Sequence, residues 1–186
     1  MADPRRVAVL VSGRGSNLKA LIDRASGYEI ALVASNRPQA QALDVARDAG
    51  VPTWAFDSRN MPREEFDSMM TRTLAEHRVG TIALAGYMRL LSPAFVARWQ
   101  GRIVNIHPSL LPKYRGLDPH ARALAAGDGV TGCTVHIVTE EVDSGEILAQ
   151  SEVAIEAGDD VASLSRRVLM AEHVLYPATL AEFVER

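Results

Sequence analysis

The 186-residue chain contains a single cysteine, Cys133, so no disulfide bond can form within it. A lone thiol is typical of a protein that works in a reducing compartment. The sequence also lacks any apolar run near the ~20 residues that a membrane-spanning helix needs. Its N-terminus, Met-Ala-Asp-Pro-Arg-Arg, lacks the cleavage pattern of a secretory signal. We therefore expect a cytoplasmic protein with no membrane partner.

A basic surface is missing as well. The formal net charge of −3 argues against a broad nucleic-acid-binding surface, which usually needs an excess of Lys and Arg. A small basic pocket for one anionic metabolite stays compatible with this charge. Hydrophobic residues make up 47% and charged residues 23% of the chain, as in soluble globular proteins. Since no repeat, low-complexity stretch or linker divides the sequence, we predict a single domain over residues 1–186.

Several common catalytic signatures are absent too. There is no G-x-S-x-G nucleophile elbow, and Cys133 lies in an apolar segment without an adjacent histidine, which indicates a buried thiol. The five histidines are scattered, with no H-E-x-x-H and no paired-cysteine spacing. We therefore predict neither a metal site nor a covalent nucleophile on the protein.

Strand-like and helix-like segments alternate along the chain, which predicts a mostly parallel sheet covered by helices on both faces. Strands are expected at residues 7–11, 30–35, 53–56, 81–85 and 102–106. Helices are expected at residues 18–25, 40–49, 63–77, after Ser92, and at 120–126. Residues 132–138 and 147–155 look like an antiparallel hairpin added to the sheet, and a helix over 160–186, broken near Pro177, closes the chain. The predicted fold class is α/β, a Rossmann-like three-layer sandwich with this hairpin near the C-terminal half.

A glycine-rich turn, S-G-R-G-S-N at residues 12–17, joins the first predicted strand to the first helix. This arrangement presents backbone N–H groups and the positive end of a helix to an anion. The turn has neither the Walker spacing nor the full G-x-G-x-x-G fingerprint. Phosphate binding is therefore one interpretation, and an ordinary turn with a Ser or Asn cap is the other.

Asn105 and His107 stand two residues apart in a short strand that Pro108 ends, so their side chains face the same side. Open α/β sheets bind ligands at such strand ends, and an acidic turn at residues 139–145 contributes Asp143 to the expected site. An amide and an imidazole can stabilise the oxyanion of a tetrahedral intermediate. A nearby carboxylate would orient the histidine and assist proton transfer from an attacking amine. These residues fit acyl transfer to a nucleophile of the substrate, and leave transferase, hydrolase and lyase open.

Four motifs together resemble the phosphoribosylglycinamide formyltransferases over nearly the whole chain. They are S-G-R-G-S-N, A-G-Y-M-R-L-L-S-P at 85–93, N-I-H-P-S-L-L-P-K-Y-R-G at 105–116, and V-D-S-G at 142–145. The N-I-H-P-S-L-L-P block is specific to the wider folate-dependent formyltransferase superfamily, and the glycine turn helps to choose among its members. The resemblance implies transfer of the formyl group of 10-formyltetrahydrofolate to the amine of glycinamide ribonucleotide in purine biosynthesis, without a metal.

The resemblance also implies roles for individual residues. The implied catalytic residues are Asn105, His107 and Asp143. The implied ribonucleotide-binding residues are Gly15, Ser16, Asn17 and Glu172. The implied folate-binding residues are Arg63, Met88, Arg89, Leu90, Leu91, Asn105, Glu140, Glu141, Val142 and Asp143. His120, Lys113 and His136 are implied as neighbours of the site, and the N-terminal half is expected to hold the phosphate while the C-terminal half binds folate and carries the catalytic groups.

Three other functions remain as alternatives. A methionyl-tRNA formyltransferase would carry a tRNA-binding domain and a basic surface, and a 10-formyltetrahydrofolate hydrolase would use water and need no phosphate loop. A non-catalytic nucleotide-binding module would not need Asn105, His107 and Asp143 together.

Many members of the family continue beyond the last helix, so a chain that ends at Arg186 is expected to be short or trimmed. Monomer and homodimer both stay open.

Overall fold

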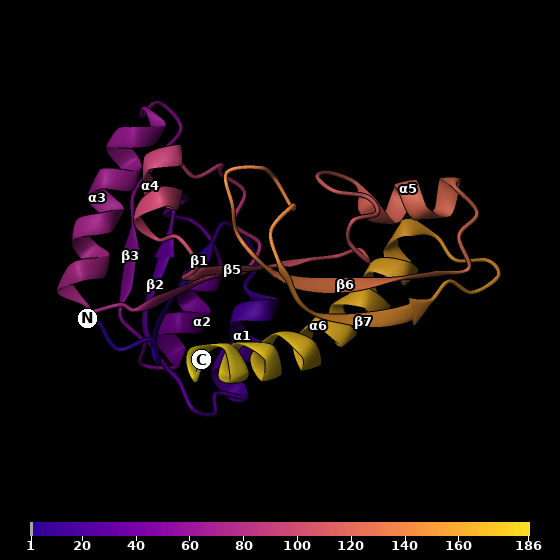
Figure 1. Cartoon of the computed structure of the whole chain (residues 1–186), viewed down its shortest axis with the longest axis horizontal. Coiled ribbons are helices and arrows are strands. Elements are labelled where there is room, and N and C mark those ends of the chain that lie inside the picture. Colours follow the sequence, from indigo (N-terminus) through magenta and orange to yellow (C-terminus); the bar gives the residue numbers. More distant parts are fainter. Residues whose placement is uncertain (1) are drawn as a thin grey trace.

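A seven-stranded mixed sheet forms the centre of the computed structural model, which describes residues 2–186 (Figure 1). Its strands lie in the order β3-β2-β1-β4-β5-β6-β7. They are β1 (Arg6–Val11), β2 (Glu29–Ser35), β3 (Thr53–Ala55), β4 (Thr81–Leu84), β5 (Ile103–His107), β6 (Val130–Ile137) and β7 (Ile147–Ala154). The first five strands pair in parallel, whereas β6 pairs antiparallel with both β5 and β7. The predicted α/β class with an antiparallel hairpin near the C-terminal half is confirmed.

Six helices connect and cover these strands within the described residues. They are α1 (Ser16–Asp23), α2 (Ala42–Asp48), α3 (Arg63–Glu76), α4 (Pro93–Arg98), α5 (Pro119–Ala125) and α6 (Val161–Val184). Helices α1, α2 and α6 pack on one face of the sheet, and α3 and α4 pack on the other (Figure 1). No helix over residues 2–186 is long and apolar enough to cross a membrane.

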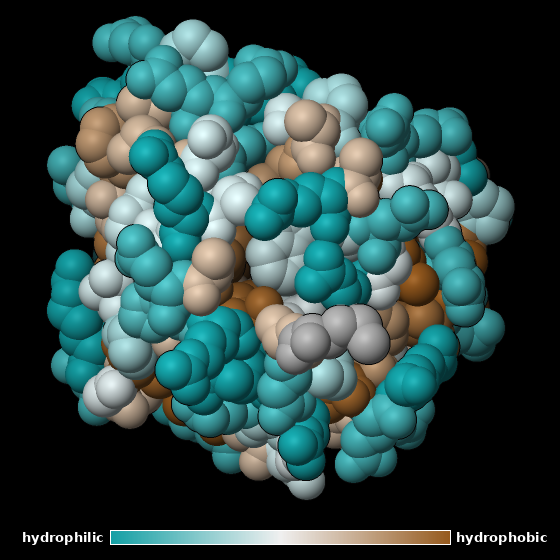
Figure 2. All heavy atoms as spheres, turned by 60° about the vertical axis from the view of Figure 1, so that its left-hand side comes forward, coloured by the Kyte–Doolittle hydropathy of each residue, from teal (hydrophilic) through white to brown (hydrophobic). Residues whose placement is uncertain are grey.

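Strand β1 shows why both faces must be covered. Its side chains alternate between two apolar clusters, so that Val7, Val9 and Val11 pack beneath α1 and α6 while Ala8 and Leu10 pack beneath α3 and α4. A strand that is apolar on both faces is typical of a parallel sheet that is covered by helices on both sides. Hydrophilic residues cover most of the face that carries α3 and β3 (Figure 2).

The closing helix α6 continues without a break from Val161 to Val184, so the predicted break near Pro177 is wrong. Proline removes one backbone donor from a helix, but the turns on both sides keep their own hydrogen bonds. The preceding residue anchors the helix, because the buried Tyr176 hydroxyl lies 3.0 Å from the Leu84 carbonyl oxygen and 3.2 Å from that of Val104. Packing on β4 and β5 therefore holds the helix together across the proline.

The carboxyl ends of β1 and β4 are tied together at the edge of the sheet. The Ser12 N–H donates to the Gly86 carbonyl over 3.2 Å, and the Met88 N–H donates to Ser12 Oγ over 2.8 Å. Strand β1 has β2 on one side and β4 on the other, so the strand order reverses here. Open α/β sheets bind ligands in the crevice outside such a switch point.

Candidate active site

Asn105 and His107 lie at the carboxyl end of β5, and the antiparallel register with β6 sets His136 opposite Asn105. The amide nitrogen of Asn105 is 3.2 Å from His136 Nε2. On its other side His136 Nδ1 lies 3.0 Å from the Ile137 carbonyl oxygen, which can only accept. Nδ1 therefore carries a proton, and Nε2 accepts from the amide of Asn105.

His107 is fixed in the same way by a backbone carbonyl. Its Nε2 lies 2.9 Å from the Tyr114 carbonyl oxygen, so Nε2 donates there. Nδ1 lies 3.3 Å from Asp143 Oδ2, and a carboxylate faces a nitrogen favourably only when that nitrogen carries a proton. Within residues 2–186 no side-chain amide contacts Nδ1 of His107, whereas the Asn105 amide contacts Nε2 of His136. The two ring nitrogens of His107 therefore both face oxygen atoms that can only accept a hydrogen bond.

Asp143 is brought back over β5 and β6 by the V-D-S-G turn. Strand β6 ends at Ile137 opposite Val104, so a straight continuation would lead away from His107. Asp143 has a left-handed backbone, with φ of 50°, and a Cβ atom at Gly145 would collide with the Ile137 carbonyl oxygen. The glycine thus permits the close return of the chain.

The Asp143 carboxylate lies between a backbone donor and two imidazole rings. Oδ2 accepts from the Gly116 N–H over 2.9 Å, and Oδ1 lies 3.4 Å from His136 Nε2. Burial by itself would raise the pKa of Asp143, but the contacts with His136 and the Gly116 N–H and the charge on His107 outweigh it and lower the pKa. Asp143 is therefore a carboxylate at neutral pH, in direct contact with His107 rather than bridged by water.

Asn17 and Glu172 meet although 155 residues separate them in the chain, and Asn17 Nδ2 donates to Glu172 Oε2 over 2.7 Å. Glu172 is buried on α6, and its burial raises the pKa of the carboxyl group more than the Asn17 amide lowers it. Gly15 precedes α1 with φ of 87°, and a Cβ atom there would lie 2.7 Å from Ala42. Ser16 begins α1 with its side chain exposed. The four residues implied in ribonucleotide binding thus come from the start of α1 and the middle of α6.

Some of the residues implied in folate binding have exposed side chains, and others form hydrogen bonds within the protein. Met88 and Leu90 are 67% and 58% exposed, which leaves apolar surface free beside the site. The Arg89 guanidinium instead donates to the carbonyl oxygens of Ser58 and Met61, at 3.1 and 2.9 Å. Arg89 therefore holds the connection between β3 and α3, and it also lies over the ring of Phe66.

The remaining folate residues are more exposed or only half-buried. Leu91 is half-buried, and Arg63 is exposed at the start of α3. Glu140, Glu141 and Val142 are exposed in the turn that carries Asp143, where Glu141 lies 3.4 Å from Arg115. Among the residues implied in folate binding, the exposed apolar side chains are Met88 and Leu90 in the β4–α4 connection and Val142 in the β6–β7 connection.

The three predicted neighbours of the site differ in their distance from its centre and in their contacts. His136 is at its centre, as described above. His120 is half-buried on α5, and burial, with a smaller effect of the charge on His107, lowers its pKa. Lys113 instead forms an ion pair with Asp128 at 3.1 Å, and Asp128 also accepts from the Tyr114 hydroxyl. Lys113 therefore stabilises the loop after β5 rather than the reacting groups.

Sequence reasoning missed the backbone groups that orient the site. The Gly116 N–H and the Tyr114 carbonyl hold Asp143 and His107, and no residue type signals the direction of a peptide group. It also missed Thr134, whose hydroxyl donates to the Ser109 carbonyl and accepts from the Leu111 N–H, fixing the loop after His107. The antiparallel pairing of β5 with β6 is the signal that could have found Thr134, which lies opposite His107.

Over residues 2–186 no group of three or more His, Cys, Asp or Glu side chains is placed to hold a metal ion. The cluster of Asn105, His107, His136 and Asp143 has three groups that can act as acids or bases and one amide donor, in contact with one another. Such a cluster can bind an oxyanion and move a proton between an amine and a leaving group.

The chain matches the sequence model of the family described as Formyl transferase over residues 5–180. It is 42% identical to phosphoribosylglycinamide formyltransferase of Escherichia coli, across 96% of this chain and 87% of that protein. It is 48% identical to the trifunctional purine biosynthetic protein adenosine-3 of Homo sapiens, across 94% of this chain. The chain spans only 18% of the length of that human protein.

Solved structures resemble it equally closely. The crystal structure of phosphoribosylglycinamide formyltransferase from Brucella melitensis is 46% identical, with a TM-score of 0.91, across 97% of this chain and 96% of that one. Glycinamide ribonucleotide transformylase 1 from Geobacillus kaustophilus is 39% identical, with a TM-score of 0.92, across 96% of this chain and 98% of that one.

Proposed function

This chain belongs to the formyl transferase family, and from that membership we propose that it transfers a formyl group from 10-formyltetrahydrofolate to the amine of glycinamide ribonucleotide. The product is an intermediate of de novo purine biosynthesis. The observation that supports this proposal best is the contact of His107 with Asp143 beside Asn105, at the carboxyl end of β5. This cluster offers an amide donor, an imidazole and a carboxylate without a protein nucleophile, so the substrate amine is the attacking group.

We assign the oxyanion to Asn105 and His107. Attack of the amine on the formyl carbon turns the formyl oxygen into an oxyanion. One N–H of the Asn105 amide is taken by His136, which leaves its second N–H for this oxygen. The His107 Nδ1–H has a long contact of 3.3 Å with Asp143, and can be shared with the oxyanion. One such donor commonly contributes about 3 kcal/mol to transition-state stabilisation.

Asp143 is the proposed carrier of the amine proton. The attacking nitrogen becomes positively charged as its bond to the formyl carbon forms, and it must lose a proton before the product can form. The Asp143 carboxylate takes this proton, directly or through water, and returns it to the folate nitrogen as its bond to the formyl carbon breaks. Tetrahydrofolate then leaves, and both protons and charges balance.

The ribonucleotide and the folate are assigned to different sides of this cluster. Gly15, Ser16 and Asn17 would present N–H groups to the phosphate, with Glu172 beside them. The folate would lie against the segments around Met88 and Val142. We also propose a single domain over residues 1–186. Its ribonucleotide site is not confined to the N-terminal half, because Glu172 lies on α6.

The proposal is tested by mixing the purified protein with 10-formyltetrahydrofolate and following the release of tetrahydrofolate. Release that depends on glycinamide ribonucleotide is the expected result. Release without the ribonucleotide would identify a hydrolase, formylation of methionyl-tRNA would identify the tRNA enzyme, and no release under any condition would exclude all three activities. Cytoplasmic location and the choice between monomer and homodimer stay predictions, which fractionation and analytical ultracentrifugation measure.

A further inference from the structure

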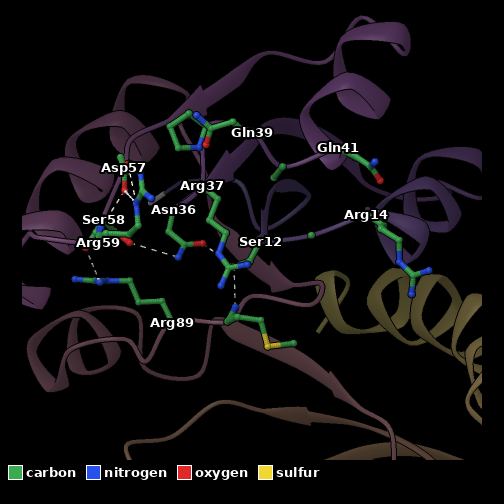
Figure 3. Close-up of a pocket in the computed structure, with 14 residues that line it drawn as sticks. Ser12, Arg14, Asn36, Arg37, Gln39, Gln41, Asp57, Ser58, Arg59 and Arg89 are labelled. Atoms are coloured by element: carbon green, nitrogen blue, oxygen red, sulfur yellow. Dashed lines mark hydrogen bonds and ion pairs between the residues drawn. The ribbon is translucent and has the colours of Figure 1, made fainter. Parts of the chain in front are cut away.

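A cavity of about 400 Å³ lies between the C-terminal ends of α3 and α4, two helices that lie side by side (Figure 1). Val79 and Arg102 line it and stand just before β4 and β5, so the cavity opens at the amino ends of these strands. The proposed active site lies at the carboxyl ends. A larger cavity, lined among others by Arg14, Arg37 and Arg59, opens there beside the segment assigned to folate (Figure 3). The smaller cavity is therefore a separate site.

Three arginines and no carboxylate line this smaller cavity. Arg102 is engaged within the protein, because it donates to the Arg98 carbonyl over 2.8 Å and its Cζ atom lies 4.5 Å from the centroid of the Trp99 ring. The guanidinium groups of Arg78 and Arg98 make no ion pair or hydrogen bond with any group of residues 2–186, and both side chains are exposed. These two arginines therefore carry uncompensated positive charge.

The polar side chains around the cavity are almost all hydrogen-bond donors. Trp99 is only 5% exposed, and its indole N–H has no hydrogen-bond partner within residues 2–186. Buried donors without a partner are uncommon in folded proteins. Among the described residues that line the cavity, only Thr71 has a side chain that can also accept. A lining so short of acceptors favours a ligand that supplies them.

Arg78 occupies a backbone position that normally favours glycine. It follows the C-terminus of α3 with φ of 54°. The Arg78 N–H donates to the Ala75 carbonyl and the Val79 N–H donates to the Leu74 carbonyl, both over 3.0 Å, which is the Schellman arrangement. Glycine adopts this conformation with less strain. Arginine at this position therefore costs stability, and an anion bound to its side chain would offset that cost.

The lining also indicates the class of ligand. A guanidinium group matches a carboxylate or a phosphate, but a phosphoryl group places up to two negative charges and three acceptor oxygens on one centre. A purine or pyrimidine base finds no open aromatic face here, because the Trp99 ring is buried and lies under Arg102. Ala2, Ala75 and Val79 line the rest of the cavity and can contact a small uncharged part of the ligand.

We propose that this cavity is a second anion site, which binds a small phosphate-bearing molecule through Arg78 and Arg98. The site goes beyond the proposed function, because it shares no residue with the positions assigned to the ribonucleotide or to the folate. Its occupant stabilises the folded protein by mass action, since the unfolded chain does not hold the two guanidinium groups together.

Trp99 provides a local measure of binding. The chain has two tryptophans, so Trp54→Phe leaves Trp99 as the only one. Inorganic pyrophosphate is the probe. We expect it to change the Trp99 fluorescence of this variant in a saturable way, with a Kd of about 1 mM or tighter at low salt. About 0.5 M potassium chloride should abolish most of the change, because salt screens the attraction between exposed charges.

Two double variants in the same background locate the site. Arg78→Gln/Arg98→Gln should weaken pyrophosphate binding at least about tenfold, because two charge-assisted contacts are lost. Arg102 stays unchanged, since it donates to the last turn of α4. The matched control is Arg72→Gln/Arg166→Gln, which removes two exposed arginines outside the cavity and should leave the Kd unchanged.

Fluorescence that does not respond to pyrophosphate up to about 10 mM would overturn the proposal, and so would equal responses of the two double variants. Citrate tests the class of ligand, because it carries three carboxylates and no phosphoryl group. We expect it to bind at least about fivefold more weakly than pyrophosphate. Citrate binding as tight as that of pyrophosphate would overturn the assignment to phosphate-bearing molecules.

Arg78→Gly separates ligand binding from the ending of α3. Glycine relieves the backbone at this position, so the melting temperature without added anion should rise. The further rise caused by pyrophosphate should be smaller than in the unaltered protein, because one of the two guanidinium groups is gone. If the pyrophosphate-dependent rise were undiminished, Arg78 would serve the helix end alone and the proposal would be wrong.

Discussion

His136 Nε2 lies 3.2 Å from the amide nitrogen of Asn105, across the antiparallel pair of β5 and β6. Because His136 Nδ1 donates to the Ile137 carbonyl, Nε2 is an acceptor and sets which end of the Asn105 amide faces it. Without this contact the amide could turn over and present its oxygen to the oxyanion. His136 is thus a positioning residue for Asn105.

Replacing His136 should lower kcat without a matching change in the KM for the ribonucleotide. We expect His136→Leu to lower kcat at least tenfold and to leave the KM for the ribonucleotide within about threefold, since the side chain reaches no part of that proposed site. His136→Gln keeps an acceptor near the position of Nε2 and should recover part of the rate. Steady-state kinetics and circular dichroism of both variants check this, and a kcat of His136→Leu within twofold of normal would contradict the positioning role.

Asp143→Asn tests the proton carrier. The amide can still accept from the Gly116 N–H, so the turn should keep its shape, but it cannot take a proton from the amine. We expect kcat to fall by a factor of 100 or more. The thermal midpoint at neutral pH should fall slightly, because the lowered pKa of Asp143 means that its carboxylate stabilises the fold there. Activity that survived within twofold would correspond to only ~0.4 kcal/mol of barrier and would exclude this role for Asp143.

Glu172→Gln should make stability depend on pH in a defined direction. Burial raises the pKa of Glu172 above that of a glutamate in the unfolded chain. The contribution of Glu172 to the stability of the fold is therefore fully present below the unfolded-state pKa, and it is lost as the pH rises through the folded-state pKa. A neutral glutamine escapes this loss and can still accept from Asn17. We therefore expect the melting temperature of the variant, relative to the unaltered protein, to be higher at pH 8 than at pH 5.

The same variant should bind the ribonucleotide less well, because an amide is a poorer acceptor than a carboxylate. A KM for the ribonucleotide raised about tenfold at pH 8, with the KM for folate unchanged, is the expected kinetic result. A melting-temperature difference that is the same at pH 5 and pH 8 would show that the buried carboxyl group is not the cause.

Two glycines of the first turn provide a matched pair. A methyl group at Gly15 would lie 2.7 Å from Ala42, and the backbone there has φ of 87°, whereas a methyl group at Gly13 meets no atom within 4 Å. We expect Gly15→Ala to lower the free energy of unfolding by about 1–3 kcal/mol, as for a strained backbone position. Gly13→Ala should change it by less than about 0.5 kcal/mol, and urea unfolding of both variants measures the difference.

Tyr176→Phe tests how α6 is anchored. The hydroxyl is fully buried and lies within hydrogen-bond distance of the carbonyl oxygens of Leu84 and Val104. Its removal should cost about 1–2 kcal/mol in the free energy of unfolding, because buried acceptors lose a partner. Urea unfolding measures this cost, and an unchanged midpoint and slope would show that the two contacts do not stabilise the fold.

Local sequence patterns predicted most of the secondary structure. A continuous apolar run marks β1, and a Ser-Pro pair marks the start of α4, where Ser92 accepts from the Phe95 N–H. These features depend on residues within one turn or one strand, so a local pattern specifies them. The break expected at Pro177 was wrong because the sheet beneath α6, which no local pattern shows, stabilises the helix across the proline.

The sequence by itself determined that Asn105 and His107 share one face at a strand end, since residues two apart in a strand always do. Only the tertiary structure decided which groups contact these two side chains. The contacts of His107 with Asp143 and of Asn17 with Glu172 depend on strand register and on the path of a turn. The side chains of Arg14, Arg37 and Arg59 line one cavity because the β1–α1, β2–α2 and β3–α3 connections that carry them start at the same edge of the sheet. Register and loop paths are set by packing over the whole domain, and for that reason they cannot be read from neighbouring residues.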